Sequence, residues 1–182
     1  MGLYCDIIRI PDDKIDKCIK LADDQNGLYR FIQDTDPENW FELDKAWHGI
    51  NYILSSISAE YEAGFLLNQG TVLRKYNWSE VYGVNVTDMR LFDTAQTNQI
   101  NNCLSKISAE IFRKNYNSGK LAVNKIYPGI WKQVRGIRRL INSLSPSELA
   151  AKEFLTGNYL RLAEFISKTA GLRTGIIIKY HQ

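Results

Sequence analysis

The chain contains two histidines, and one of them stands where it could take part in chemistry. His48 follows Asp44 by four residues, so on a helix the carboxylate would lie one turn away and could orient the imidazole as a general base. Such a base also needs a nucleophile, and the sequence has no G-x-S-x-G motif to provide a serine. Three roles stay open for His48: a structural hydrogen bond at the edge of the core, contact with a ligand or partner, and catalysis.

The segment around this histidine predicts a helix that begins near Leu43 and runs to about Ser56. Asp44 is expected to cap its N-terminus, because a carboxylate accepts hydrogen bonds from the free N–H groups there. Apolar residues at i, i+3, i+7 and i+10 predict a stripe that faces the core: Trp47, Ile50, Leu54 and Ile57. A polar stripe lies beside it and carries Asp44, His48, Asn51 or Tyr52, and Ser55.

Metal chemistry is not expected from this sequence. The three cysteines, Cys5, Cys18 and Cys103, are far apart, and no C-x-x-C motif occurs. Together with only two histidines, this spacing matches no zinc site. We therefore predict three buried, free thiols in a reducing cytosol and assign neither a metal nor a cofactor.

Two charged segments are candidate surfaces for a partner. The basic segment lies on a predicted helix whose apolar stripe runs from Ile130 to Leu144, and its cations share another face: Lys132, Arg135, Arg138 and Arg139. This face is either a docking surface for phosphate or an acidic partner, or an ordinary solvated surface. Residues 28–43 interleave aromatic and acidic side chains and form either a rim beside the Asp44 helix or a solvated loop. The net charge of +3 is mild, so no nucleic-acid partner is expected.

Length and hydropathy indicate one domain. The 182 residues suffice for a single domain with its own core, which we place at residues 1–182. No apolar run approaches the ~20 residues that a membrane-spanning helix needs, and the N-terminus lacks the pattern of a signal peptide. We expect a cytoplasmic protein without membrane contact.

The first part of the chain predicts a strand followed by helices. Residues 3–10 are rich in β-branched and aromatic residues, which favours a strand. Pro11 begins a helix that should end at Asn26-Gly27. A short helix and a loop are expected over residues 28–43. The core face of the first helix should contain Ile15, Cys18, Ile19 and Ala22.

The middle of the chain is more mixed. Residues 64–73 predict a strand or a short helix with a turn, and residues 84–91 alternate enough to be a strand. Asp93 or Thr94 should cap a helix, and Ser108 should begin another one. Four apolar residues at i, i+3, i+4 and i+7 predict the core face of the first of these helices: Ile100, Cys103, Leu104 and Ile107.

The last part of the chain predicts helix and then strand. Residues 145–148 match a capping box with proline at the first helical position. The helix should break near residues 156–158, and a second segment should end at Gly171. Residues 174–180 are apolar and β-branched, which indicates a strand buried on both faces and therefore central in a sheet. The predicted fold class is α+β with about four strands.

Several of these motifs, in this order, resemble the YfbM-like family of small bacterial proteins. They are the run from Asp44 to Ile50, then Tyr82-Gly83, then the run from Ile126 to Trp131, and finally a helix and an apolar strand. The D-K-A-W-H run is the most specific of them. This chain departs from the family in its mildly basic charge, in Val84 where proline is common, and in an expanded stretch over residues 145–157.

The resemblance implies a single cytosolic α+β domain with a mixed sheet and surrounding helices. The family is a domain of unknown function, so the resemblance implies no activity and no catalytic residues. If the family shares a pocket, the matching positions of this chain that would line it are Trp47, His48, Tyr82, Tyr127 and Trp131. With Asp44, these residues are the candidates for contact with a ligand or partner.

Two functions are compatible with the sequence. The first is a non-enzymatic protein-binding module, for example an immunity protein that neutralises a cognate toxin. The missing catalytic set and the separate acidic (34–44) and basic (132–139) surfaces favour it, since complementary charges steer association. The second is a small-ligand-binding protein or hydrolase with a cleft around the Asp44–His48 helix. The sequence leaves the oligomeric state open.

Overall fold

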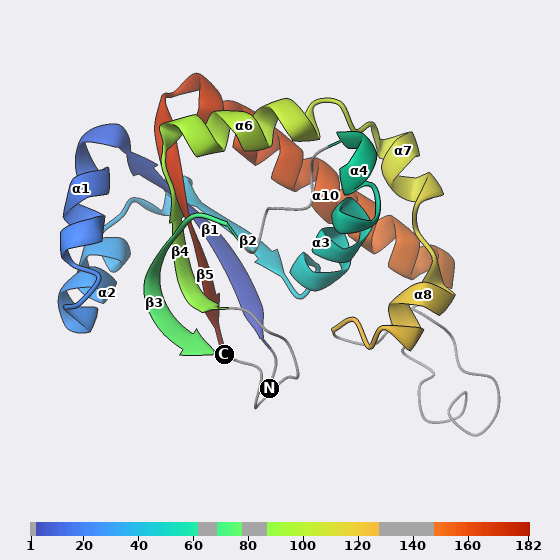
Figure 1. Cartoon of the computed structure of the whole chain (residues 1–182), viewed down its shortest axis with the longest axis horizontal. Coiled ribbons are helices and arrows are strands. Elements are labelled where there is room, and N and C mark those ends of the chain that lie inside the picture. The colour runs from blue at the N-terminus through green and yellow to red at the C-terminus, as the bar shows by residue number, and fades with distance from the viewer. Residues whose placement is uncertain (1–2, 62–68, 78–86, 128–147) are drawn as a thin grey trace.

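The computed structural model describes residues 3–61, 69–77, 87–127 and 148–182. In these ranges a five-stranded sheet separates two groups of helices (Figure 1). The strand order is β2-β1-β5-β4-β3, so β1 and β5 lie side by side near the centre. The strands are β1 (Tyr4–Pro11), β2 (Trp40–Asp44), β3 (Thr71–Asn77), β4 (Thr87–Phe92) and β5 (Thr174–His181).

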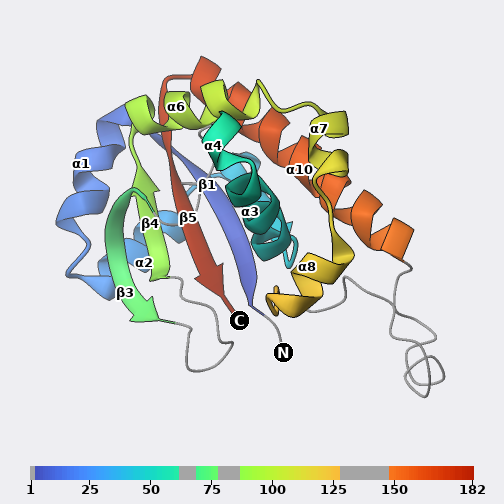
Figure 2. The same cartoon turned by 45° about the vertical axis from the view of Figure 1, so that its right-hand side comes forward.

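Two helices cover one face of the sheet, namely α1 (Asp12–Lys20) and α2 (Gln25–Gln33). The other face is covered by α3 (Trp47–Ser56), α6 (Thr94–Leu104) and the long helix α10 (Glu148–Gly171) (Figures 1 and 2). Among the described helices, none has both the length and the apolar character needed to cross a bilayer. Short helical elements complete the fold: η1 (Pro37–Asn39), α4 (Ser58–Tyr61), α7 (Ala109–Lys114) and α8 (Ser118–Val123).

The α+β architecture is confirmed, but the sheet differs from the prediction in two respects. It has five strands among the described residues instead of about four, and every pairing of these strands is antiparallel instead of mixed. The apolar run of β5 is central and buried, as predicted. An apolar run reports burial on both faces and not strand direction, because helices on both sides can cover an antiparallel sheet as well as a parallel one.

The helix expected to end at Asn26-Gly27 ends at Lys20 instead. Asn26 and Gly27 lie inside α2, because the Asp24 carboxylate accepts the Gly27 N–H at 3.0 Å and caps a new helix there. Ile19, expected in the core, is 45% exposed. The capping capacity of an aspartate therefore outweighs the helix-ending tendency of the Asn-Gly pair.

Asp44 does not cap a helix. It is the last residue of β2, with a φ of 50°, a backbone conformation that aspartate tolerates better than most residues. Helix α3 begins three residues later at Trp47, and its N-cap residue Ala46 provides no side-chain bond. The predicted apolar stripe is confirmed, since these residues are between 0% and 6% exposed: Trp47, Ile50, Leu54 and Ile57.

The predicted helix starts in the middle of the chain are confirmed. Asp93 caps α6, and its carboxylate and the Gln96 side chain form a reciprocal capping box. Ser108 caps α7 by accepting the Ile111 N–H at 3.2 Å. The expected core face of α6 is buried: Ile100, Cys103 and Leu104, followed by Ile107.

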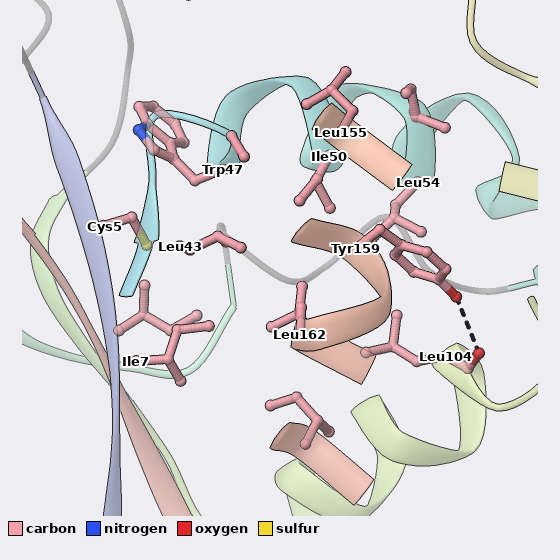
Figure 3. Packing of buried hydrophobic residues seen from close by; sticks show 14 of the residues in the cluster. Cys5, Ile7, Leu43, Trp47, Ile50, Leu54, Leu104, Leu155, Tyr159 and Leu162 are labelled. Atoms are coloured by element: carbon pink, nitrogen blue, oxygen red, sulfur yellow. Dashed lines mark hydrogen bonds between the residues drawn. The ribbon is translucent and has the colours of Figure 1, made fainter. Parts of the chain in front are cut away.

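Helix α10 is continuous over 24 residues, so the break predicted at residues 156–158 is wrong. Packing explains the difference, because Tyr159 and Leu162 are buried against α3, α6 and the sheet (Figure 3). The Tyr159 hydroxyl lies 2.6 Å from the Ile107 carbonyl oxygen and 3.2 Å from that of Leu104. Its ring stacks on Phe112 at a centroid distance of 4.3 Å. These contacts offset the helix-breaking tendency of one glycine, which costs about 1 kcal/mol.

Two glycines of this chain should respond in opposite ways to alanine. Gly157 is exposed in the middle of α10, and a methyl group on its Cα would meet no heavy atom within 4 Å. Gly157→Ala should raise the free energy of unfolding by about 0.5–1 kcal/mol, because alanine loses less backbone entropy in a helix. Urea unfolding followed by circular dichroism measures this change.

Gly175→Ala is the matched comparison. Its methyl group would lie 2.5 Å from the Phe92 carbonyl oxygen of the neighbouring strand, so the β4–β5 pair must move. It should lower the free energy of unfolding by about 1–3 kcal/mol. Equal effects of the two substitutions would contradict the continuous α10 and the close approach of β4 and β5.

Candidate functional site

Two predicted site residues, Trp47 and Tyr127, bond to the main chain of Leu3, and a third, His48, bonds to Tyr127. The Trp47 Nε1–H donates to the Leu3 carbonyl oxygen at 3.1 Å, and the Tyr127 hydroxyl accepts the Leu3 N–H at 2.9 Å. The His48 Nδ1 in turn accepts the main-chain N–H of Tyr127 at 3.0 Å. The ring centroids of Trp47 and His48 are 4.9 Å apart, and those of Trp47 and Tyr127 are 6.3 Å apart. We call this set the Leu3 clamp, because it fixes the start of β1 against α3.

The clamp leaves His48 little capacity for chemistry. Burial lowers the pKa of His48 to about 4, so the imidazole is neutral at pH 7. Because Nδ1 accepts a hydrogen bond, the proton of the neutral ring is on Nε2, and no lone pair is free to take a proton from a substrate. Of the three roles that the sequence left open, the geometry supports a structural hydrogen bond at the edge of the core.

A cleft of about 760 Å³ lies elsewhere, where β1, β2 and β5 end beside α10. Asp44 lines this cleft, whereas Trp47, His48 and Tyr127 do not. The strands and α10 together supply its walls: Tyr4, Asp6, Glu42, Asp44, Phe154, Asn158, Arg161, His181 and Gln182.

Asp6 is the most buried charged group of this cleft, at 7% exposure. Its Oδ2 lies 2.9 Å from the His181 Nε2, and Tyr4 stacks on the imidazole at a centroid distance of 5.8 Å. Burial raises the pKa of Asp6, while His181 and Lys179 oppose that rise. The Glu42 carboxylate adds to it, since Glu42 lies directly opposite Asp6 in the β1–β2 pair. The wall formed by the strands is therefore acidic.

Two smaller hollows continue from this cleft along β2. One of about 510 Å³ lies between the loop before β2 and Arg161, and one of about 200 Å³ lies beside Arg9 and Lys168. Arg161 lines all three hollows, Glu42 lines the first two, and Phe41 lines the last two. The three hollows thus adjoin one another through these shared residues, and we call them together the β2–α10 groove.

Arg161 stands over the middle of this groove. Its guanidinium lies 5.3 Å from the centroid of the Phe41 ring, which in turn stacks on Phe165 at 5.1 Å. Arg9 lies 4.3 Å from the centroid of Phe165, and its Nε donates to the Thr169 hydroxyl at 2.9 Å. The far end of the groove carries Arg9 and Arg161, together with Lys168 in an ion pair with Glu164 at 2.7 Å, in contrast to the acidic end at Asp6 and Glu42.

The remaining predicted site residues lie outside the described ranges: Tyr82 and Trp131 of the expected pocket, and Lys132, Arg135, Arg138 and Arg139 of the basic face. The three cysteines are buried and free, as predicted. Within the described ranges, no group of three or more His, Cys, Asp or Glu side chains is arranged to hold a metal ion.

Sequence reasoning missed Asp6, His181, Glu42 and Arg161 as residues of a common site. One signal was present, because Asp6 is the single charged residue between Leu3 and Ile8 in an apolar strand. The other three become neighbours of Asp6 only through the strand order and the position of α10.

The family of the chain follows from comparison with known proteins. A model of the family described as "Domain of unknown function (DUF1877)" matches residues 1–179. The chain belongs to the DUF1877 family. This confirms the YfbM-like resemblance that the sequence motifs indicated.

A solved structure shares the DUF1877 fold of this chain. It is the crystal structure of a protein of unknown function, YfbM from Escherichia coli, with a TM-score of 0.60 and 14% sequence identity. The match covers 98% of this chain and 99% of that chain. At this identity the likeness establishes the fold and carries no activity with it. No curated protein matches the sequence.

The Leu3 clamp should make the stability of this DUF1877 protein depend on pH. The unfolded chain takes up a proton at His48 near pH 6.5, whereas the folded chain does so only near pH 4. The contribution of neutral His48 to the free energy of unfolding is complete above pH 6.5. It is lost as the pH falls toward 4, by up to about 3 kcal/mol. Urea unfolding at a series of pH values measures this loss.

The control is His48→Asn, whose Oδ1 can stand where Nδ1 stands and accept the Tyr127 N–H without titrating. Other groups contribute to the pH dependence in both proteins, so the difference between the two curves isolates His48. That difference should be flat above pH 6.5 and should change between pH 6.5 and 4. Parallel curves over this range would contradict a buried, neutral His48.

Proposed function

We propose that this DUF1877 protein is a non-enzymatic protein-binding module that holds an extended segment of a partner protein in the β2–α10 groove. The observation that carries the proposal is the series of three adjoining hollows that share Arg161 and each include a residue of β2. The five residues of β2 span about 17 Å, and a compact metabolite would fill one hollow, whereas a peptide chain would fill the series.

Charge supports a partner that is a polypeptide. One end of the groove carries Asp6, Glu42 and Asp44, and the other end carries Arg9 and Arg161, with Lys168 paired to Glu164. A segment with charges of both signs could match both ends, and such complementarity provides specificity and steers association. In the toxin-neutralising form of the proposal, the segment belongs to a cognate toxin in the same cytoplasm.

The alternative, a ligand-binding protein or hydrolase centred on the Asp44–His48 helix, receives less support. His48 accepts a main-chain N–H and lies outside the cleft, so the helix does not present a general base to it. The Leu3 clamp uses the three aromatic and imidazole rings to position β1 instead.

Affinity capture with a matched pair of charge variants tests the proposal. Arg161 is exposed and lines all three hollows, so Arg161→Glu should change the groove without unfolding the protein. The wild type should retain a stoichiometric partner from its own cell lysate, and Arg161→Glu should retain at least about tenfold less of it. Quantitative mass spectrometry of the captured proteins measures the ratio.

Lys106→Glu is the control, since Lys106 is an exposed lysine after α6 that lines none of the three hollows. It introduces the same change of charge and should leave capture at the wild-type level. A partner that is retained equally by Arg161→Glu, or the absence of any stoichiometric partner, would contradict the proposal.

A further inference from the structure

Strand β2 is an unpaired edge of the sheet. Among the described residues it pairs with β1 alone, and the groove lies along its other side. A hollow of about 510 Å³ lies along this edge, lined by Trp40, Phe41 and Glu42 of β2 and by Arg161 of α10, and no described strand pairs with β2 on that side. Main-chain N–H and C=O groups at such an edge can pair with an additional strand.

The side chains of β2 indicate which strand would fit. Phe41 and Leu43 are buried toward α10, whereas Glu42 and Asp44 are exposed and line the acidic cleft. Residues that face each other across two strands interact best when their charges are opposite. An added strand should therefore alternate, with basic side chains beside Glu42 and Asp44 and apolar side chains beside Phe41.

The acidic cleft also carries an unbalanced repulsion. Asp6 and Glu42 lie directly opposite each other in the β1–β2 register, and like charges in that position are destabilising. His181 and Lys179 lie on the inner side of Asp6, in β5, and none of the described cations stands in an ion pair with Glu42. A lysine or arginine side chain beside Glu42 would relieve this repulsion from the outer side.

The same charges argue against a second copy of this chain as the occupant. Pairing of β2 with β2 of another copy would bring two sets of Glu42 and Asp44 together at one edge. Like charges on neighbouring strands oppose association, which is a common protection of sheet edges. A partner of opposite charge meets no such barrier.

We propose that a partner segment joins the sheet as an additional strand beside β2, with alternating basic and apolar residues next to Glu42, Asp44 and Phe41 and an acidic residue toward Arg161. This inference rests on the proposed function and specifies how the groove recognises its occupant. The main-chain hydrogen bonds of the partner segment provide affinity, and its basic side chains provide specificity.

A peptide selection tests the sequence pattern. The probe is a phage-displayed library of random twelve-residue peptides, selected on the wild type and depleted on the variant Glu42→Lys/Asp44→Lys. Enriched peptides should alternate basic and apolar residues. They should bind at least about tenfold more weakly to Glu42→Gln/Asp44→Asn, which keeps the shape of both side chains, and their affinity should fall with salt. Circular dichroism confirms that both variants are folded.

Methylation of the peptide main chain then separates strand pairing from simple charge attraction. Two versions of the best peptide carry N-methyl groups at alternate positions, odd or even, with every side chain unchanged. In an added strand only one set of N–H groups points at β2, so one version should lose at least about tenfold in affinity and the other less than about twofold.

Peptides without alternation, equal effects of the two methylation patterns, or no peptide that depends on Glu42 and Asp44 would each overturn strand addition. The proposed function is tested separately, by capturing a partner whose binding depends on Arg161. If such a partner is captured and the peptide results are negative, the groove binds proteins in another way. If the partner is absent as well, the proposed function fails too.

Discussion

The eight residues of β1 lie in register with the eight residues of β5, and the rest of the structure is attached to this pair. On one face, side chains such as Ile7 and Ile178 pack against α3, α6 and α10, and on the other, Ile8 and Ile177 pack against α1 and α2. Among the described strands, β2 is joined to the sheet through β1 alone. The Leu3 clamp fixes the start of β1 and thereby also the edge along which the groove runs.

The side chains of β1 and β5 on the α1 and α2 face change from apolar to polar along the strands. Toward one end, their residues on the α1 and α2 face are apolar and covered, whereas toward the other end this face carries Tyr4, Asp6 and His181. A carboxylate with this degree of burial is costly, and the neighbouring His181 and Lys179 only partly compensate for it. A strand selected for stability alone would carry an apolar residue at position 6. The acidic group is found instead where the sheet has an open edge.

The elements that depend on local interactions were predictable from the sequence. Asp93 and Ser108 cap their helices, and the stripe from Trp47 to Ile57 is buried, because these features follow from neighbours a few residues away. The errors occurred where tertiary packing decides, as in α10, which continues through Gly157, and in β2, which ends at Asp44 before its helix begins. The candidate site was harder to predict, since Asp6, Arg161 and His181 become neighbours only through the strand order.

The central position of β1 and β5 has a consequence for synthesis on the ribosome. Tyr4 pairs with His181, so the two ends of this contact are separated by almost the whole chain, and closure of so large a loop is slow. A nascent chain can form α1, α2 and local hairpins, but it has no β5 against which to place β1 until Thr174 and the residues after it have been made. A groove that requires a settled β1 therefore comes into existence only after β5 has been made, and a partner can engage it only from that point of synthesis onward.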